Sequence, residues 1–185
     1  MTSNRKRQTR NWSLFLLGGF LAWTGSSAEL YVAAGNPAAA EPYDSWANAA
    51  ATIQAAVDYA QENDIIRVTN GVYAVGGRTA TGASLTNRVT LDKAVSVIAV
   101  STNPADTVIV GEWDVPSPNG TNAVRCAYLA EGAFLAGFTL TNGATRVTTD
   151  NDGRAGGVFC EGLGAVVSNC VIIAPSANRD AAAGY

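Results

Sequence analysis

The chain has 185 residues, of which 48% are hydrophobic and 15% charged, and it contains no histidine. This length is typical of a single domain. The charged fraction lies well below the soluble average of about 25%, which argues against a disordered chain, a coiled coil or a highly charged nucleic-acid binder. Without histidine, the chain holds no Ser-His-Asp triad, Cys-His dyad or histidine-ligated zinc site.

The first 28 residues have the features of an export signal. Four basic side chains lie between residues 5 and 10, an apolar run extends from Trp12 to Trp23, and small residues follow at Ser26 and Ala28. The apolar run is too short to cross about 30 Å of hydrocarbon. We therefore predict a signal peptide over residues 1–28 and an extracellular or outer cell-surface location, with an uncleaved membrane anchor as the alternative.

Removal of the signal leaves an acidic chain. Eight Lys and Arg remain against 15 Asp and Glu, which gives residues 29–185 a net charge of about −7. An acidic surface does not favour DNA, RNA or an anionic polysaccharide as partner. We expect no nucleic-acid partner and no transmembrane segment after the signal.

A short strand and one helix open the mature part. Residues 30–32 predict the strand, and a loop rich in Ala, Gly and Pro follows over residues 33–43. Apolar residues then recur at i, i+3, i+4 and i+7, as on one face of a helix: Ile53, Ala56, Val57 and Ala60. Asp44 or Ser45 is the predicted N-cap, and Asn63 suits a left-handed cap after the helix. Short β-branched runs then predict strands at 65–69, 72–75, 89–91, 95–100 and 107–110.

An internal repeat occupies the second half of the chain. Segment 125–140 is echoed by segment 158–172, and with Ala133 aligned on Ala165, Leu140 falls on Ile172. Each copy holds two short strands joined by a Gly-containing bend. A strand pair that cannot bury its own inward face, repeated at about 32 residues, predicts a solenoid of stacked rungs. Strands 95–100 and 107–110 are the predicted preceding rung.

Several segments resemble a known superfamily. Residues 52–57, 64–68 and 71–73 resemble the opening of right-handed parallel β-helix proteins of the pectin-lyase-like superfamily. Residues 87–93 and 137–143 resemble exported bacterial β-helix repeat proteins akin to polymorphic outer-membrane proteins. The resemblance implies an all-β right-handed parallel β-helix with one N-terminal capping α-helix. It says little about activity, because the superfamily contains lyases, hydrolases, adhesins and autotransporter passengers.

The predicted organisation is a signal peptide over 1–28, an N-terminal strand and capping helix over 29–70, and about three rungs over 71–185. Residues 176–185 stop where a further Gly-rich rung would begin. We expect the N-terminal portion of a longer solenoid. The alternatives are end-to-end self-association with another copy and a tail that folds back as a cap.

The resemblance also allows the chain to be compared with the catalytic residues of the superfamily's enzymes. Polygalacturonase-like members use clustered aspartates with a Gly-His-Gly loop, which a chain without histidine lacks. Pectate-lyase-like members use calcium-binding carboxylates with an Arg or Lys base. Only segment 150–154 comes close, since Asp150 and Asp152 offer hard oxygen ligands for calcium. The alternative is a polar insertion loop between rungs.

The cysteines and aromatic residues give two further candidates. Cys126 and Cys160 are predicted at matching positions on successive rungs if two residues are deleted between the copies, either as a buried stack or as a disulfide. A catalytic thiol is disfavoured because no histidine activates it. Trp113 is the candidate for an exposed sugar contact, although packing in the core or loops is the alternative for it and for Tyr31, Tyr43, Trp46, Tyr73 and Tyr128.

These observations favour an exported cell-surface or extracellular scaffold of adhesin type, whose loops face a polysaccharide or a cell surface. We expect no catalytic activity and no cofactor in this stretch, apart from the calcium hypothesis. The alternative function is the N-terminal part of a polysaccharide lyase or glycoside hydrolase whose catalytic rungs lie beyond residue 185.

Overall fold

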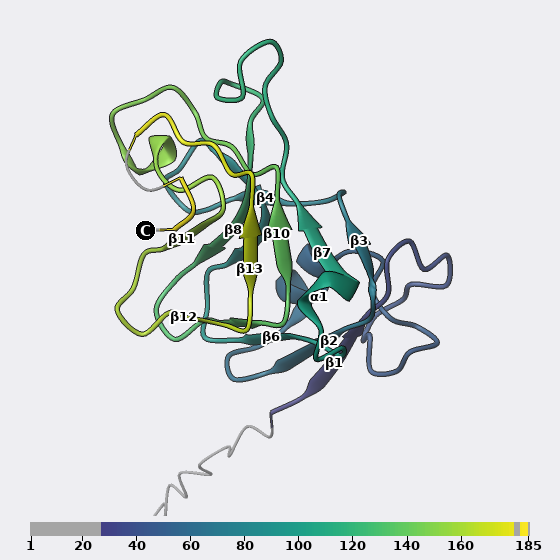
Figure 1. The fold of residues 1–185 in the computed structure, drawn as a ribbon. Helices are drawn as coiled ribbons and strands as arrows, with labels where there is room; N and C mark the ends of the chain where they lie inside the picture. Colours follow the sequence, from purple (N-terminus) through teal and green to yellow (C-terminus); the bar gives the residue numbers. More distant parts are fainter. Residues whose placement is uncertain (1–26, 180–181, 185) are drawn as a thin grey trace, which may run out of the picture.

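The computed structural model describes residues 27–179 and 182–184, so residues 1–26 of the predicted signal peptide lie outside the described part. The described chain folds as a parallel β-helix of about five turns (Figure 1). The predicted fold class is confirmed. The expectation of about three rungs was too low, because the opening strand and the strands before residue 95 already belong to the stack.

Three sheets run along the helix axis. Sheet A has the order β1-β2-β6-β9-β12, sheet B the order β3-β7-β10-β13 and sheet C the order β4-β5-β8-β11. All neighbours are parallel except β4 and β5, which are antiparallel. The bounds are β1 (Glu29–Val32), β2 (Ile65–Val68), β6 (Ser96–Ala99), β9 (Phe134–Ala136) and β12 (Val166–Ser168); β3 (Gly71–Tyr73), β7 (Thr107–Val110), β10 (Thr139–Thr141) and β13 (Val171–Ile173); and β4 (Arg78–Thr79), β5 (Thr86–Leu91), β8 (Val124–Leu129) and β11 (Val158–Cys160).

The strand register explains the sequence repeat. Leu135 pairs with Val167 and Leu140 with Ile172, as the predicted alignment requires. Successive turns therefore place equivalent residues in columns inside the solenoid. One column in sheet A is formed by Leu30, Ile66, Val97, Leu135 and Val167. The first four of these side chains are buried in the main core, and Val167 packs against it.

The extra residues of the turns gather at one corner. Segment 74–85, which includes β4, lies between β3 and β5, and segments 111–123 and 142–157 connect β7 to β8 and β10 to β11. The connections at the other two corners have seven residues or fewer. The segment after β7 projects farthest from the stack, at the top of the view (Figure 1). The corner between sheets B and C is therefore where the fold departs from a plain solenoid.

Helix α1 (Ile53–Tyr59) forms the N-terminal cap and packs against β1, β2 and β5. Its N-cap is Thr52, whose side chain accepts a hydrogen bond from Ala55 N. The prediction of Asp44 or Ser45 as the N-cap was wrong, because both lie in a preceding loop where they hydrogen-bond with Asn48. Asn63 does adopt a left-handed φ of 71°, but in a turn after the helix rather than as its cap.

Gln54 on α1 covers the open edge of β5. Its side-chain oxygen accepts a hydrogen bond from Thr90 N at 2.7 Å, and its amide nitrogen donates to Thr90 O at 3.3 Å. Gln54 is only 4% exposed. One glutamine amide thus takes the place of the peptide group that a neighbouring strand would supply, which satisfies two buried backbone groups.

No helix among residues 27–179 and 182–184 has the length and apolar character needed to cross a membrane.

Replacing Gln54 with Met should lower the free energy of unfolding by about 1–3 kcal/mol, because Thr90 loses both partners in a buried place. Gln54→Glu keeps the acceptor but places a second carboxylate oxygen against Thr90 O and Asp58 Oδ1, so it should also destabilise the fold. Chemical denaturation followed by circular dichroism measures both changes. The control is Gln61→Met, at an exposed residue just after the helix, which should change stability by less than about 0.5 kcal/mol. Equal effects at the two positions would contradict the role given to Gln54.

Candidate functional site

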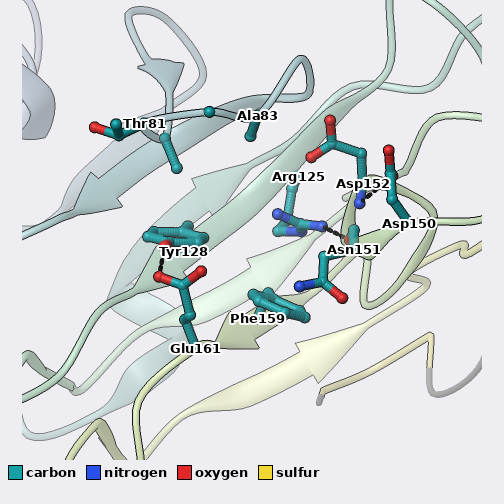
Figure 2. A pocket seen from close by; sticks show the side chains of 11 residues that line it. Thr81, Ala83, Arg125, Tyr128, Asp150, Asn151, Asp152, Phe159 and Glu161 are labelled. Atoms are coloured by element: carbon teal, nitrogen blue, oxygen red, sulfur yellow. Dashed lines mark hydrogen bonds between the residues drawn. The ribbon is translucent and has the colours of Figure 1, made fainter.

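A pocket of about 310 Å³ opens on the outer face of sheet C, at the corner that carries the inserted segments. Figure 2 shows its side chains, which come from β8, from β11 and the residue after it, and from two inserted loops. The pocket is lined by Ala80, Thr81, Gly82, Ala83, Arg125, Tyr128, Asp150, Asn151, Asp152, Phe159 and Glu161.

The floor of the pocket is aromatic. Along β8, Ala127 and Leu129 belong to the main core, so Tyr128 between them points to the outer face. Phe159 pairs with Tyr128 in register, and the two rings are stacked with their centroids 6.0 Å apart. Tyr128 is 8% exposed and Phe159 is 3% exposed. The rings therefore form a nearly covered floor and offer little free surface for stacking.

Arg125 holds one wall of the pocket in place. Its guanidinium donates hydrogen bonds to the carbonyl oxygens of Asn151, Arg154 and Ala155 at 2.8–2.9 Å and to Asn87 Oδ1 at 3.0 Å. Its charged group also lies 5.0 Å from the centre of the Phe159 ring. Burial lowers the pKa of Arg125 to about 10, so the group stays charged at neutral pH. Three bonds to one loop fix that loop over sheet C.

The base of this loop is narrow because Gly143 and Gly156 touch where the chain leaves and re-enters the stack. A Cβ on Gly143 would overlap the carbonyl oxygen of Gly156, and one on Gly156 would overlap Ser176 O. Only glycine allows the two backbones to approach this closely.

Asp152 joins the two walls of the pocket. It is 7% exposed, and its Oδ2 accepts hydrogen bonds from Ser84 N at 2.6 Å and Leu85 N at 3.0 Å. Asp150 caps the short 3-10 helix η2 (Asn151–Gly153) by accepting from Asp152 N at 2.9 Å. Asp152 therefore ties segment 80–85, from one turn, to segment 142–157, two turns later in the stack.

The rim carries exposed polar groups, among them Thr81, Asp150, Asn151 and Glu161. Glu161 accepts a hydrogen bond from the Tyr128 hydroxyl. Burial, reinforced by this hydrogen bond, raises the pKa of Tyr128 well above its usual value. The phenol therefore stays protonated and a hydrogen-bond donor at neutral pH.

The two predicted calcium ligands lie in this pocket. Asp152 Oδ2 is already engaged by two backbone amides, and Asp150 Oδ1 by one. Within the residues that the structure describes, no group of three or more Asp, Glu, Cys or His is arranged to hold a metal ion. The geometry gives both carboxylates a structural role, and the calcium site stays a prediction.

The predicted pairing of Cys126 with Cys160 was wrong. Cys160 pairs with Leu129, three residues further along β8 than Cys126, because the register between β8 and β11 differs from the assumed deletion of two residues. Cys126, Cys160 and Cys170 are free thiols. Burial raises the pKa of Cys126 to about 12.

Trp113, the predicted sugar contact, is 45% exposed but is not part of the pocket lining. It follows Glu112, which pairs with Val124 at the base of segment 111–123. The other aromatic residues are dispersed: Tyr31 packs on Trp46, Tyr43 on Tyr59, and Tyr73 is buried. Of the six aromatic candidates, only Tyr128 reaches the pocket.

Sequence reasoning missed Arg125, Phe159 and Glu161. The sequence does give an indication for Arg125, because it is a charged residue inside an otherwise apolar strand. Phe159 could be expected opposite Tyr128 only once the register of β8 and β11 is known. No sequence pattern around Glu161 indicates that it lines a pocket.

Comparison of the chain with protein-family models, with curated proteins and with solved structures finds no match.

Replacing Asp152 with Ala should lower the free energy of unfolding by about 1–3 kcal/mol, because two backbone amides lose their acceptor. Thermal melting with calcium and with a chelator measures the change, and Asp44→Ala is a control at an exposed aspartate. If Asp152 acts by hydrogen bonding, the loss is the same in both solutions. A calcium-dependent rise in melting temperature that the variant abolishes would instead establish the calcium site.

Thiol titration tests the cysteine arrangement. In the native protein Cys126 should react most slowly, since it is buried and its pKa is raised to about 12 by that burial. After unfolding without reductant, all three thiols should react. Cys126→Ala should remove one thiol from the unfolded count and leave the fast native reaction unchanged. A single thiol in the unfolded wild type would reveal a disulfide and contradict this assignment.

Proposed function

We propose that the chain is an exported β-helix scaffold of adhesin type, related to the pectin-lyase-like superfamily, that binds a short saccharide segment in the pocket on sheet C. The observation that carries the proposal is the pocket itself, which is built by loops from separate turns and fixed by Arg125 and Asp152. Export to the cell surface rests on the predicted signal over residues 1–28.

The chemistry of the pocket suits a saccharide. Its volume of about 310 Å³ lies at the lower end of the usual range for ligand sites, about 300–1,000 Å³. The rim offers a hydroxyl, an amide and carboxylates to ligand hydroxyl groups, while Ala80 and Ala83 add apolar groups to the lining. A sugar ring has the same combination of polar edges and apolar faces.

The groups in the pocket favour binding over catalysis. Arg125 and Asp152 are engaged in holding the loops, so neither is free as a base. Tyr128 keeps its proton because burial and Glu161 raise its pKa. The remaining exposed groups, Asp150 and Glu161, lack an activated nucleophile or a cationic base beside them among the lining residues. A lyase function would need a cationic base from elsewhere.

A bulky side chain at the rim of the pocket should weaken saccharide binding. A panel of soluble tetrasaccharides, screened by ligand-observed NMR, should include at least one that binds the wild type, and Thr81→Trp at the rim should weaken that binding at least tenfold. Thr121→Trp is the matched control, because Thr121 is also an exposed threonine and lies outside the pocket lining. Equal binding by both variants would contradict the assigned site.

The same purified protein tests the enzymatic alternative. We expect no ultraviolet absorbance from unsaturated products when it is incubated with pectate and calcium. Formation of such products by the wild type, lost in Thr81→Trp, would replace the binding function with a lyase function.

A further inference from the structure

We propose that the pocket on sheet C selects a sugar that bears a free amine, as in an oligosaccharide of 2-amino-2-deoxyhexose, over neutral and acidic sugars. The inference rests on the saccharide-binding function proposed above and adds the class of its ligand.

The lining residues carry an excess of negative charge. Three carboxylates line the pocket, those of Asp150, Asp152 and Glu161, against the single guanidinium of Arg125. Asp150 and Glu161 are exposed, and they stand on opposite sides of the Arg125 and Phe159 side chains (Figure 2). A protonated amine entering between the loops therefore meets carboxylates on two sides.

The one cation of the lining is not available to an acidic ligand. Arg125 is 2% exposed, and four of its five N–H donors are used by Asn87 and three loop carbonyls. Its charge is opposed locally by the buried carboxylate of Asp152. An acidic sugar would have to displace these bonds, which hold the wall of the pocket.

The two neighbouring arginines are also engaged within the protein. Arg154 donates to Asn151 Oδ1 and Arg179 donates to Thr149 O, and neither side chain lines the pocket. The acceptors that remain on the rim are carboxylate oxygens and the Thr81 hydroxyl, which suit an ammonium group with three donors. An acetylated amine loses the charge and two of those donors.

Isothermal titration calorimetry with the wild type tests the inference. The three ligands are the tetramer of glucosamine, its N-acetylated counterpart and tetragalacturonate. At mildly acidic pH, where sugar amines are protonated, the glucosamine tetramer should bind up to about fivefold more tightly than the acetylated one, because one ion pair with an exposed carboxylate contributes up to about 1 kcal/mol. The difference should shrink as sodium chloride is added.

The double variant Asp150→Asn, Glu161→Gln keeps an oxygen acceptor at both positions and removes both charges. It should reduce the affinity for the glucosamine tetramer more than the affinity for the acetylated tetramer, and so remove the preference of the wild type for the amine. Its melting temperature verifies that the variant is folded. The control is Glu41→Gln, Glu62→Gln, which removes the same charge from exposed positions outside the pocket lining and should leave binding unchanged.

The outcomes separate the inference from the proposed function. Preference for tetragalacturonate, or equal binding of the amine and its acetylated form, overturns the inference and keeps a saccharide site. Failure of all three tetrasaccharides, together with failure of the wider panel, overturns the proposed function as well. A lysine-rich peptide that binds more tightly than the amino sugar, and loses binding in Thr81→Trp, would assign the pocket to a cationic protein segment.

Discussion

The structure depends on the parallel backbone pairing between successive turns. This pairing fixes the register, so a residue such as Leu135 must lie beside Val97 of the previous turn and Val167 of the next. A one-residue shift would turn the inward side chains outward. Extra residues are therefore confined to the corners, and here the long insertions fall at the corner between sheets B and C. The pocket exists because the stack tolerates insertions at that corner while the core columns stay unbroken.

A loop that leaves the stack must still satisfy its own backbone. Arg125 solves this problem for segment 142–157 by donating to three of its carbonyl groups, and Asp152 solves it for segment 80–85 by accepting from two amides. Burying either charge alone would be costly. The negative charge of Asp152 partly offsets the free-energy cost of burying the positive charge of Arg125. The two residues that hold the pocket walls therefore also stabilise each other.

The stacking was predictable from the sequence because it depends on periodic patterns. The repeat fixed the alignment of Leu140 with Ile172, and the apolar stripe on residues 53–60 located the helix, since both patterns reflect a face that must be buried. The cap residue, the Cys126 register and the pocket were not predictable in this way. They depend on loop lengths between strands and on contacts such as Asp152 with Ser84, which join residues 68 positions apart. The structural preferences of neighbouring residues do not predict such a contact.

The acidity of the chain has a structural explanation that bears on the ligand proposed above. Each of the eight basic side chains after residue 28 donates a hydrogen bond within the protein: Arg67, Arg78, Arg88, Lys93, Arg125, Arg146, Arg154 and Arg179. The cations thus serve mainly as ties between loops, strands and the capping helix, whereas Glu41, Asp44 and Glu62 are exposed at the N-terminal end. A chain that uses its positive groups internally presents a negative field to approaching ligands. The pocket, with two exposed carboxylates above a buried arginine, repeats on a small scale the charge distribution of the whole molecule.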